Sequence, residues 1–161
     1  MNTGSIAVFG RNNDPNQSII FVATGEGDTG SPGVGFLRSM DGGRTWRVLD
    51  SSTNADAAGN ILPIGDAGRD HRFVGTTAFK VVVDPRALPN GEVIVYAALS
   101  GANGGIWRSN DTGKHWTLVR GGVATDVVLS AGSASLNGNL QILYAAFRGA
   151  GKDRILRIVR Q

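Results

Sequence analysis

The chain contains no cysteine among its 161 residues. Disulfide bonds, thiolate metal sites and cysteine nucleophiles are therefore excluded. No apolar run approaches the about 18 residues that a membrane-spanning helix needs, so the sequence predicts no membrane span. Histidine is scarce, and His71 and His115 are too isolated to predict a metal site. We therefore expect neither a metal ion nor another cofactor, with calcium as the one alternative considered below.

Charged residues are also sparse, at 18% of the chain, with 16 Lys and Arg against 13 Asp and Glu. The arginines are spaced along the sequence instead of forming a basic run, as Arg154, Arg157 and Arg160 illustrate. Binding to nucleic acid requires basic side chains gathered on one face, so we expect no nucleic-acid partner. Glycine is abundant, at 24 residues, which favours many short strands joined by turns over helices.

Strand-like runs recur along the chain. Three similar apolar runs occupy residues 21–25, 95–101 and 143–149, and a second run follows each of them at 35–39, 105–109 and 154–158. A β-branched run precedes each pair. Four antiparallel strands in about 45 residues are typical of one blade of a β-propeller. The repeat therefore predicts an all-β fold, a propeller segment of about three four-stranded antiparallel blades.

The repeat also predicts how a single domain, residues 1–161, is divided. Blade 1 covers about 5–50, an inserted loop covers 51–78, blade 2 covers about 79–121, and a partial blade 3 covers about 124–161. The inserted loop is rich in Gly, Asn, Asp and Ala and shows no alternation of apolar and polar residues. The third unit ends where its Asp-Gly turn is expected, so the last blade is predicted to be incomplete.

Two octamers, at residues 39–46 and 109–116, follow the pattern Ser-x-Asp-x-Gly-x-Thr-Trp, except that His115 replaces the threonine of the second. This pattern resembles the Asp-box, or bacterial neuraminidase repeat, of sialidases, sortilin-type receptors and xyloglucan-cleaving enzymes. The resemblance implies that the boxes are structural hairpins on the propeller face opposite the ligand site. The residues given this structural role are Ser39, Asp41, Gly43, Thr45, Trp46, Ser109, Asp111, Gly113 and Trp116. Their chemistry agrees, since Asp accepts backbone N–H groups in tight turns and Gly adopts positive φ.

The position of the Asp-boxes within each blade also predicts which loops share the opposite, ligand-binding face. Candidate ligand residues on those loops are Glu26, Asp28, Asp66, Arg69, Asp70, His71 and Arg148. Acids mixed with Arg and His on loops suit a glycan or a calcium ion. The plainer interpretation, which we favour, is that these side chains only solvate long loops.

No catalytic residue is assigned from the sequence. Sialidases require a Tyr nucleophile, but Tyr96 and Tyr144 occupy the same repeated strand position, which predicts a core role. Other glycosidases require two facing carboxylates, and no spacing here selects a pair. We expect a non-catalytic, secreted or cell-surface scaffold for protein or glycan binding. The alternative is part of a sialidase-like or other glycoside hydrolase whose catalytic residues lie largely outside this chain.

An open arc of three blades exposes sheet faces and strand edges to water. The expected partners are therefore further propeller blades or copies of the chain itself, together with a glycan or protein ligand.

Overall fold

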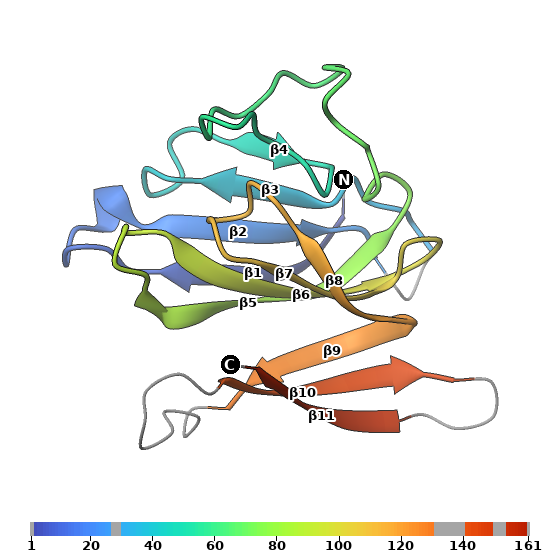
Figure 1. The fold of residues 1–161 in the computed structure, drawn as a ribbon. Helices are drawn as coiled ribbons and strands as arrows, with labels where there is room; N and C mark the ends of the chain where they lie inside the picture. The colour runs from blue at the N-terminus through green and yellow to red at the C-terminus, as the bar shows by residue number, and fades with distance from the viewer. Residues whose placement is uncertain (1, 27–29, 131–140, 150–153, 161) are drawn as a thin grey trace.

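The computed structural model describes residues 2–26, 30–130, 141–149 and 154–160. In this part of the chain the secondary structure consists of three antiparallel sheets and one short 3-10 turn, η1 (Pro15–Gln17) (Figure 1). The all-β prediction is confirmed. None of the described helices is long and apolar enough to cross a membrane.

Each sheet is a meander in which strands that follow one another in sequence also pair. Sheet I contains β1 (Thr3–Phe9), β2 (Ile19–Thr24), β3 (Phe36–Ser39) and β4 (Arg47–Leu49). Sheet II contains β5 (Thr77–Ala87), β6 (Val93–Ser100), β7 (Gly105–Ser109) and β8 (Thr117–Gly121). Sheet III contains β9 (Val123–Leu129), β10 (Gln141–Arg148) and β11 (Arg154–Arg160). The three sheets thus have four, four and three strands.

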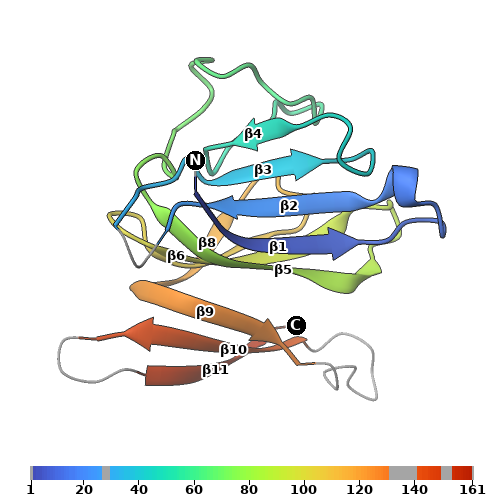
Figure 2. The same cartoon turned by 180° about the vertical axis from the view of Figure 1, so that it is seen from behind.

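Sheet II lies between sheets I and III, and the view from behind shows the same layering (Figure 1; Figure 2). Its strand β6 is buried on both faces, as expected of a strand whose sequence is an unbroken apolar run. Alternate residues serve the two neighbours: Val93, Val95, Ala97 and Leu99 join the core with sheet I, and Ile94, Tyr96 and Ala98 join the core with sheet III. The first strands of the sheets are neighbours too, since β5 contacts both β1 and β9.

Aromatic rings fill the core between sheets I and II. The indole of Trp116 stacks on Phe36 with ring centroids 4.8 Å apart, and Phe73 packs edge-on against both. Trp107 meets Phe73 at 5.1 Å, again edge-on. Offset and edge-to-face pairs of this kind add about 0.5–1.5 kcal/mol beyond the area that they bury.

The octamer of residues 39–46, called the first Asp-box for its resemblance to that repeat, forms the β3–β4 hairpin through its own side chains. The backbone N–H of Gly43 donates to Ser39 Oγ (2.8 Å), and that of Thr45 donates to Asp41 Oδ1 (2.9 Å). The Thr45 hydroxyl donates to the other carboxylate oxygen of Asp41 at 2.6 Å. Gly43 has φ +94°, a conformation that suits glycine.

The second Asp-box repeats these bonds in the β7–β8 hairpin. The backbone N–H of Gly113 donates to Ser109 Oγ (2.8 Å), and that of His115 donates to Asp111 Oδ1 (2.9 Å). His115 also takes over the side-chain contact of the missing threonine, since its Nδ1 lies 2.7 Å from Asp111 Oδ2. The substitution at this position therefore preserves the hairpin.

The segment between β4 and β5 has no regular strand, but it is packed against the sheets. The N–H of Trp116 donates to Ser52 O and that of Asn54 donates to Lys114 O, both at 2.8 Å. Phe73, from the same segment, is completely buried. The segment thus contacts the second Asp-box at one point and fills the core at another.

The tryptophans of the two boxes occupy equivalent positions but differ in burial, 5% exposed for Trp116 and 41% for Trp46. Replacing Trp116 with alanine opens a cavity between two sheets and should cost about 3–5 kcal/mol. Trp46→Ala should cost about 1 kcal/mol, because its ring is already partly in water. Urea unfolding of dilute protein measures both, and equal losses would contradict the difference in packing.

Hydrogen bonds from Thr45 and Ser39 lower the pKa of Asp41 from 3.8 to about 2. The bonds to this carboxylate therefore contribute stability that is fully present above about pH 4 and lost as the pH falls through about 2. We expect Asp41→Asn to be less stable than the wild type at neutral pH and to lose stability less steeply between pH 4 and 2. Melting temperatures across that range test this, and parallel curves for the two proteins would refute it.

Candidate functional site

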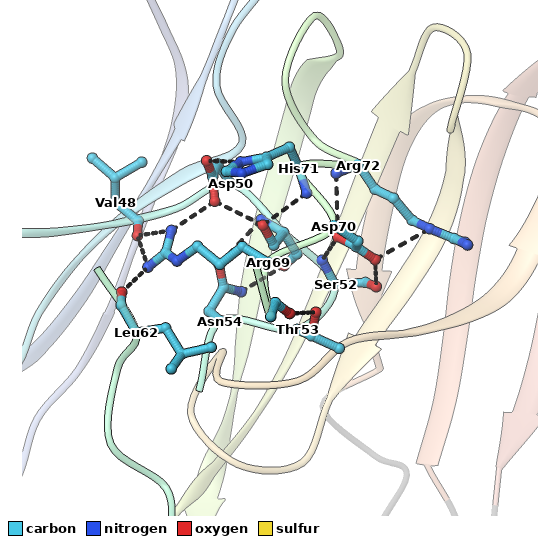
Figure 3. A network of polar contacts seen from close by, with 12 residues as sticks. Val48, Asp50, Ser52, Thr53, Asn54, Leu62, Arg69, Asp70, His71 and Arg72 are labelled. Carbon is cyan, nitrogen blue, oxygen red and sulfur yellow. Dashed lines mark hydrogen bonds and ion pairs between the residues drawn. The ribbon is translucent and has the colours of Figure 1, made fainter. Parts of the chain in front are cut away.

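A network of polar side chains lies where the chain leaves β4, around the buried carboxylate of Asp50 (Figure 3). Arg69 Nη1 donates to Asp50 Oδ1 at 2.6 Å, and Ser51 Oγ donates to the same oxygen at 2.8 Å. His71 Nδ1 lies 2.7 Å from Asp50 Oδ2. Two arms of the 50–76 segment are thereby held together by one carboxylate.

Burial alone would raise the pKa of Asp50. Hydrogen bonds from His71, Ser51 and Arg69 outweigh that effect and hold the pKa below its usual value. The carboxylate is therefore ionised at neutral pH and cannot serve as a proton donor.

Arg69 is part of the scaffold, although the sequence made it a ligand candidate. Its side chain is almost completely buried. Besides Asp50, its guanidinium donates to two carbonyl oxygens, Val48 O at 3.2 Å and Leu62 O at 2.8 Å. Arg69 thus ties the edge strand β4 to the following segment and offers a ligand little access.

Three neighbouring side chains form the accessible rim of the network: Asp70, His71 and Arg72. Asp70 accepts the N–H of Ser52 at 2.8 Å and pairs with Arg72 Nε at 3.2 Å. The side chain of Arg72 is 55% exposed and that of His71 is 41% exposed. His71 has φ +50°, which is unusual for a residue other than glycine and marks a constrained turn. The rim presents donors and acceptors side by side.

Three other sequence candidates, Glu26, Asp66 and Arg148, have their places outside this network. Glu26 accepts a hydrogen bond from Asn2 Nδ2, and Asp66 Oδ1 accepts the N–H of Gly68 at 2.8 Å. Arg148 is exposed at the end of β10, in sheet III. Asp28 lies outside the described residues. Among the predicted residues that the structure describes, Arg69, Asp70 and His71 are the ones brought together.

Sequence reasoning missed the residues that organise the network, namely Asp50, Ser51, Ser52, Asn54 and Arg72. Asn54 is fully buried, and its Oδ1 accepts the N–H of Ser51 at 3.1 Å. These residues stand in an irregular segment, where spacing does not reveal which side chains meet. The adjacency of Asp70, His71 and Arg72 was the one available signal.

Within the described residues, no group of three or more His, Cys, Asp or Glu side chains is placed to hold a metal ion. The carboxylates of the two Asp-boxes, Asp41 and Asp111, accept hydrogen bonds from within their own hairpins. The burial of Asp111 would raise its pKa, but hydrogen bonds from His115 and Ser109 hold it below the usual value.

Removing one member of the buried Asp50–Arg69 pair leaves the other charge without its partner. Arg69→Met and Asp50→Asn should therefore each cost about 3–5 kcal/mol. The double variant should lose clearly less than the sum, because the two residues share one interaction. Arg72→Met, which breaks an exposed pair, is the matched control and should cost about 1 kcal/mol or less. Additive losses in urea unfolding would show that the pair is not coupled.

Comparison with known proteins leaves the family open. No protein-family model matches the chain, and no curated protein matches it. Among solved structures, one titled "Crystal structure of unknown function protein" from Dyadobacter fermentans DSM 18053 aligns with a TM-score of 0.42 and 19% identity. The alignment covers 92% of this chain and 36% of that chain, so this chain spans about a third of that protein's length.

Proposed function

We propose that the chain is a non-catalytic segment of an Asp-box β-propeller that binds a glycan or a protein through the rim formed by Asp70, His71 and Arg72. The three sheets are then consecutive blades. Two observations support that arrangement: each sheet is an antiparallel meander, and the first strand of the middle sheet contacts the first strand of each neighbour. The matching hydrogen bonds of the two boxes support it further.

The observation that favours binding over catalysis is the state of the carboxylates. Asp50 is buried, has three donors and has a lowered pKa, whereas a glycosidase acid needs a raised pKa and access to its substrate. Asp70 is occupied by Ser52 and Arg72. The glycoside hydrolase alternative requires two carboxyl groups that both reach the substrate.

The rim itself suits a hydroxyl-rich or acidic ligand. Arg72 presents an exposed guanidinium, which binds carboxylates and hydroxyl groups in a planar fork. Asp70 holds that guanidinium in place, since its carboxylate pairs with Arg72 Nε at 3.2 Å. Asn103 Nδ2 donates to Arg72 O at 2.9 Å, so the backbone that carries the guanidinium is tied to sheet II. A fixed backbone lowers the entropy that a ligand contact costs.

Titration with 3′-sialyllactose and with a neutral xyloglucan oligosaccharide, followed by amide NMR, tests the proposal. We expect shifts confined to residues 50–76 and 103, and about tenfold weaker binding for Arg72→Ala, since charged hydrogen bonds are lost. Arg44→Ala, an exposed arginine in the first Asp-box, is the control and should bind like the wild type.

Loss of binding in both variants would place the glycan elsewhere. Absence of binding by either sugar would restrict the proposal to protein ligands, which cross-linking at position 72 can test. Hydrolysis of a fluorogenic sialoside by purified protein would refute the non-catalytic assignment.

A further inference from the structure

The two outer sheets each leave one apolar face uncovered. We call the face that a sheet turns toward the following sheet its front, and the opposite face its back. Sheet II is covered on both: its back packs on the front of sheet I, and its front packs on the back of sheet III. The back of sheet I and the front of sheet III have no neighbour in the described part of the chain.

The front of sheet III repeats a surface that is buried elsewhere in the molecule. The strand registers make Tyr144 equivalent to Tyr96 and Ile155 equivalent to Ile106. Tyr96 and Ile106 are both 0% exposed beneath sheet III, whereas Tyr144 is 44% and Ile155 80% exposed. The same residue types are thus buried in sheet II and exposed in sheet III, where no other sheet of the described chain covers them.

The back of sheet I repeats the complementary surface. Trp46 Nε1 donates to Gly43 O at 2.9 Å, just as Trp116 Nε1 donates to Gly113 O at 3.0 Å, so both indoles fold over their own hairpins. Trp116 then stacks on Phe36 of the preceding sheet, while the outer side of Trp46 meets water. Ile6 and Val8, from β1, extend this exposed surface and are 64% and 60% exposed.

The charges are complementary as well. Between sheets I and II, the buried Arg38 donates from Nη1 to Thr112 O in the second Asp-box, at 2.8 Å and close to the charges of Asp111 and Glu92. Arg157 takes the equivalent place on the front of sheet III and is exposed. On the back of sheet I, the residue equivalent to Thr112 is Gly42, next to Asp41 in the first Asp-box. Inside the chain, Arg38 meets the second Asp-box. Their equivalents, Arg157 and the first Asp-box, both lie on the surface.

We propose that a second copy of the chain covers these faces, with the back of sheet I of one copy seated on the front of sheet III of the other. The contact continues the front-to-back packing that already joins sheets I, II and III. It places Trp46 against Tyr144 and Ile155, and Arg157 against the hairpin of Asp41. The contact is heterologous, so copies either close into a ring or extend as a chain. It is independent of the glycan rim, because none of these residues belongs to the 50–76 segment.

Light scattering coupled to size-exclusion chromatography tests the proposal on the full chain. The wild type should have at least twice the mass of one chain, in a concentration-dependent equilibrium. Ile155→Glu destroys only the front of sheet III and Trp46→Glu only the back of sheet I, so each variant alone should be a monomer. Mixed together they should form a 1:1 dimer, because one intact front then meets one intact back. Val74→Glu, an exposed apolar residue on neither face, is the control and should assemble like the wild type.

A monomeric wild type at every concentration would overturn the proposal and assign the faces to further sheets of a longer polypeptide. Self-association of either variant alone would also overturn it, since a front-to-front or back-to-back contact needs only one kind of face. Circular dichroism shows whether the variants are folded, and Arg157→Glu with Val8→Glu forms a milder pair for the same mixing test. Sugar binding at the rim is measured in a separate titration. A negative result there does not change what the mass measurement says about assembly.

Discussion

The fold depends on a middle strand, β6, whose side chains are apolar and buried on both faces of its sheet. Exposing one face of such a strand would cost roughly 1.5–3 kcal/mol for each large apolar side chain. Sheet II is therefore stable only with a sheet packed against each face. The strands equivalent to β6 in the outer sheets carry the same two-sided pattern, with Phe21 and Leu143 buried on the covered faces. This two-sided apolar pattern holds the three sheets together. It also gives sheets I and III an apolar face on the side turned away from sheet II.

The Asp-boxes give this packing a fixed geometry. Side-chain bonds within each hairpin set its shape, and the first box has these bonds although no sheet in the described residues covers its tryptophan. The hydrogen bonds of the hairpin therefore do not depend on a neighbouring sheet. In the second box that shape presents Trp116 to Phe36 and a backbone carbonyl to Arg38, so two contacts between sheets come from one turn. A repeated turn of this kind makes the front-to-back contact repeatable.

The sequence predicted the strands well where apolar runs and turn residues coincide, as along β6 and on both sides of the second Asp-box. It predicted little of the site. Arg69 and His71 were chosen because they are polar residues of a predicted loop, yet Arg69 is buried in the scaffold and His71 contacts the unpredicted Asp50. Strand periodicity tells which face a side chain occupies, but an irregular segment has no period. Asn54, for example, donates its N–H to the carbonyl oxygen of Lys114, which is 60 residues further along the chain, and no local pattern predicts such a contact.

The buried Asp50–Arg69 pair has a physical consequence for the rim. Taking two charges out of water costs several kcal/mol per ion, and their attraction does little more than offset that cost. In the observed arrangement of the segment, Arg69 reaches its carboxylate and two carbonyl oxygens at once. We infer that the pair favours this arrangement over others, and so adds specificity more than stability. That arrangement holds Asp70, His71 and Arg72 in a fixed rim. If the proposed binding and the proposed assembly both hold, each copy contributes one rim. Front-to-back assembly would then present several rims to one polyvalent glycan, and linked sites of modest affinity bind with higher avidity where their spacing matches the ligand.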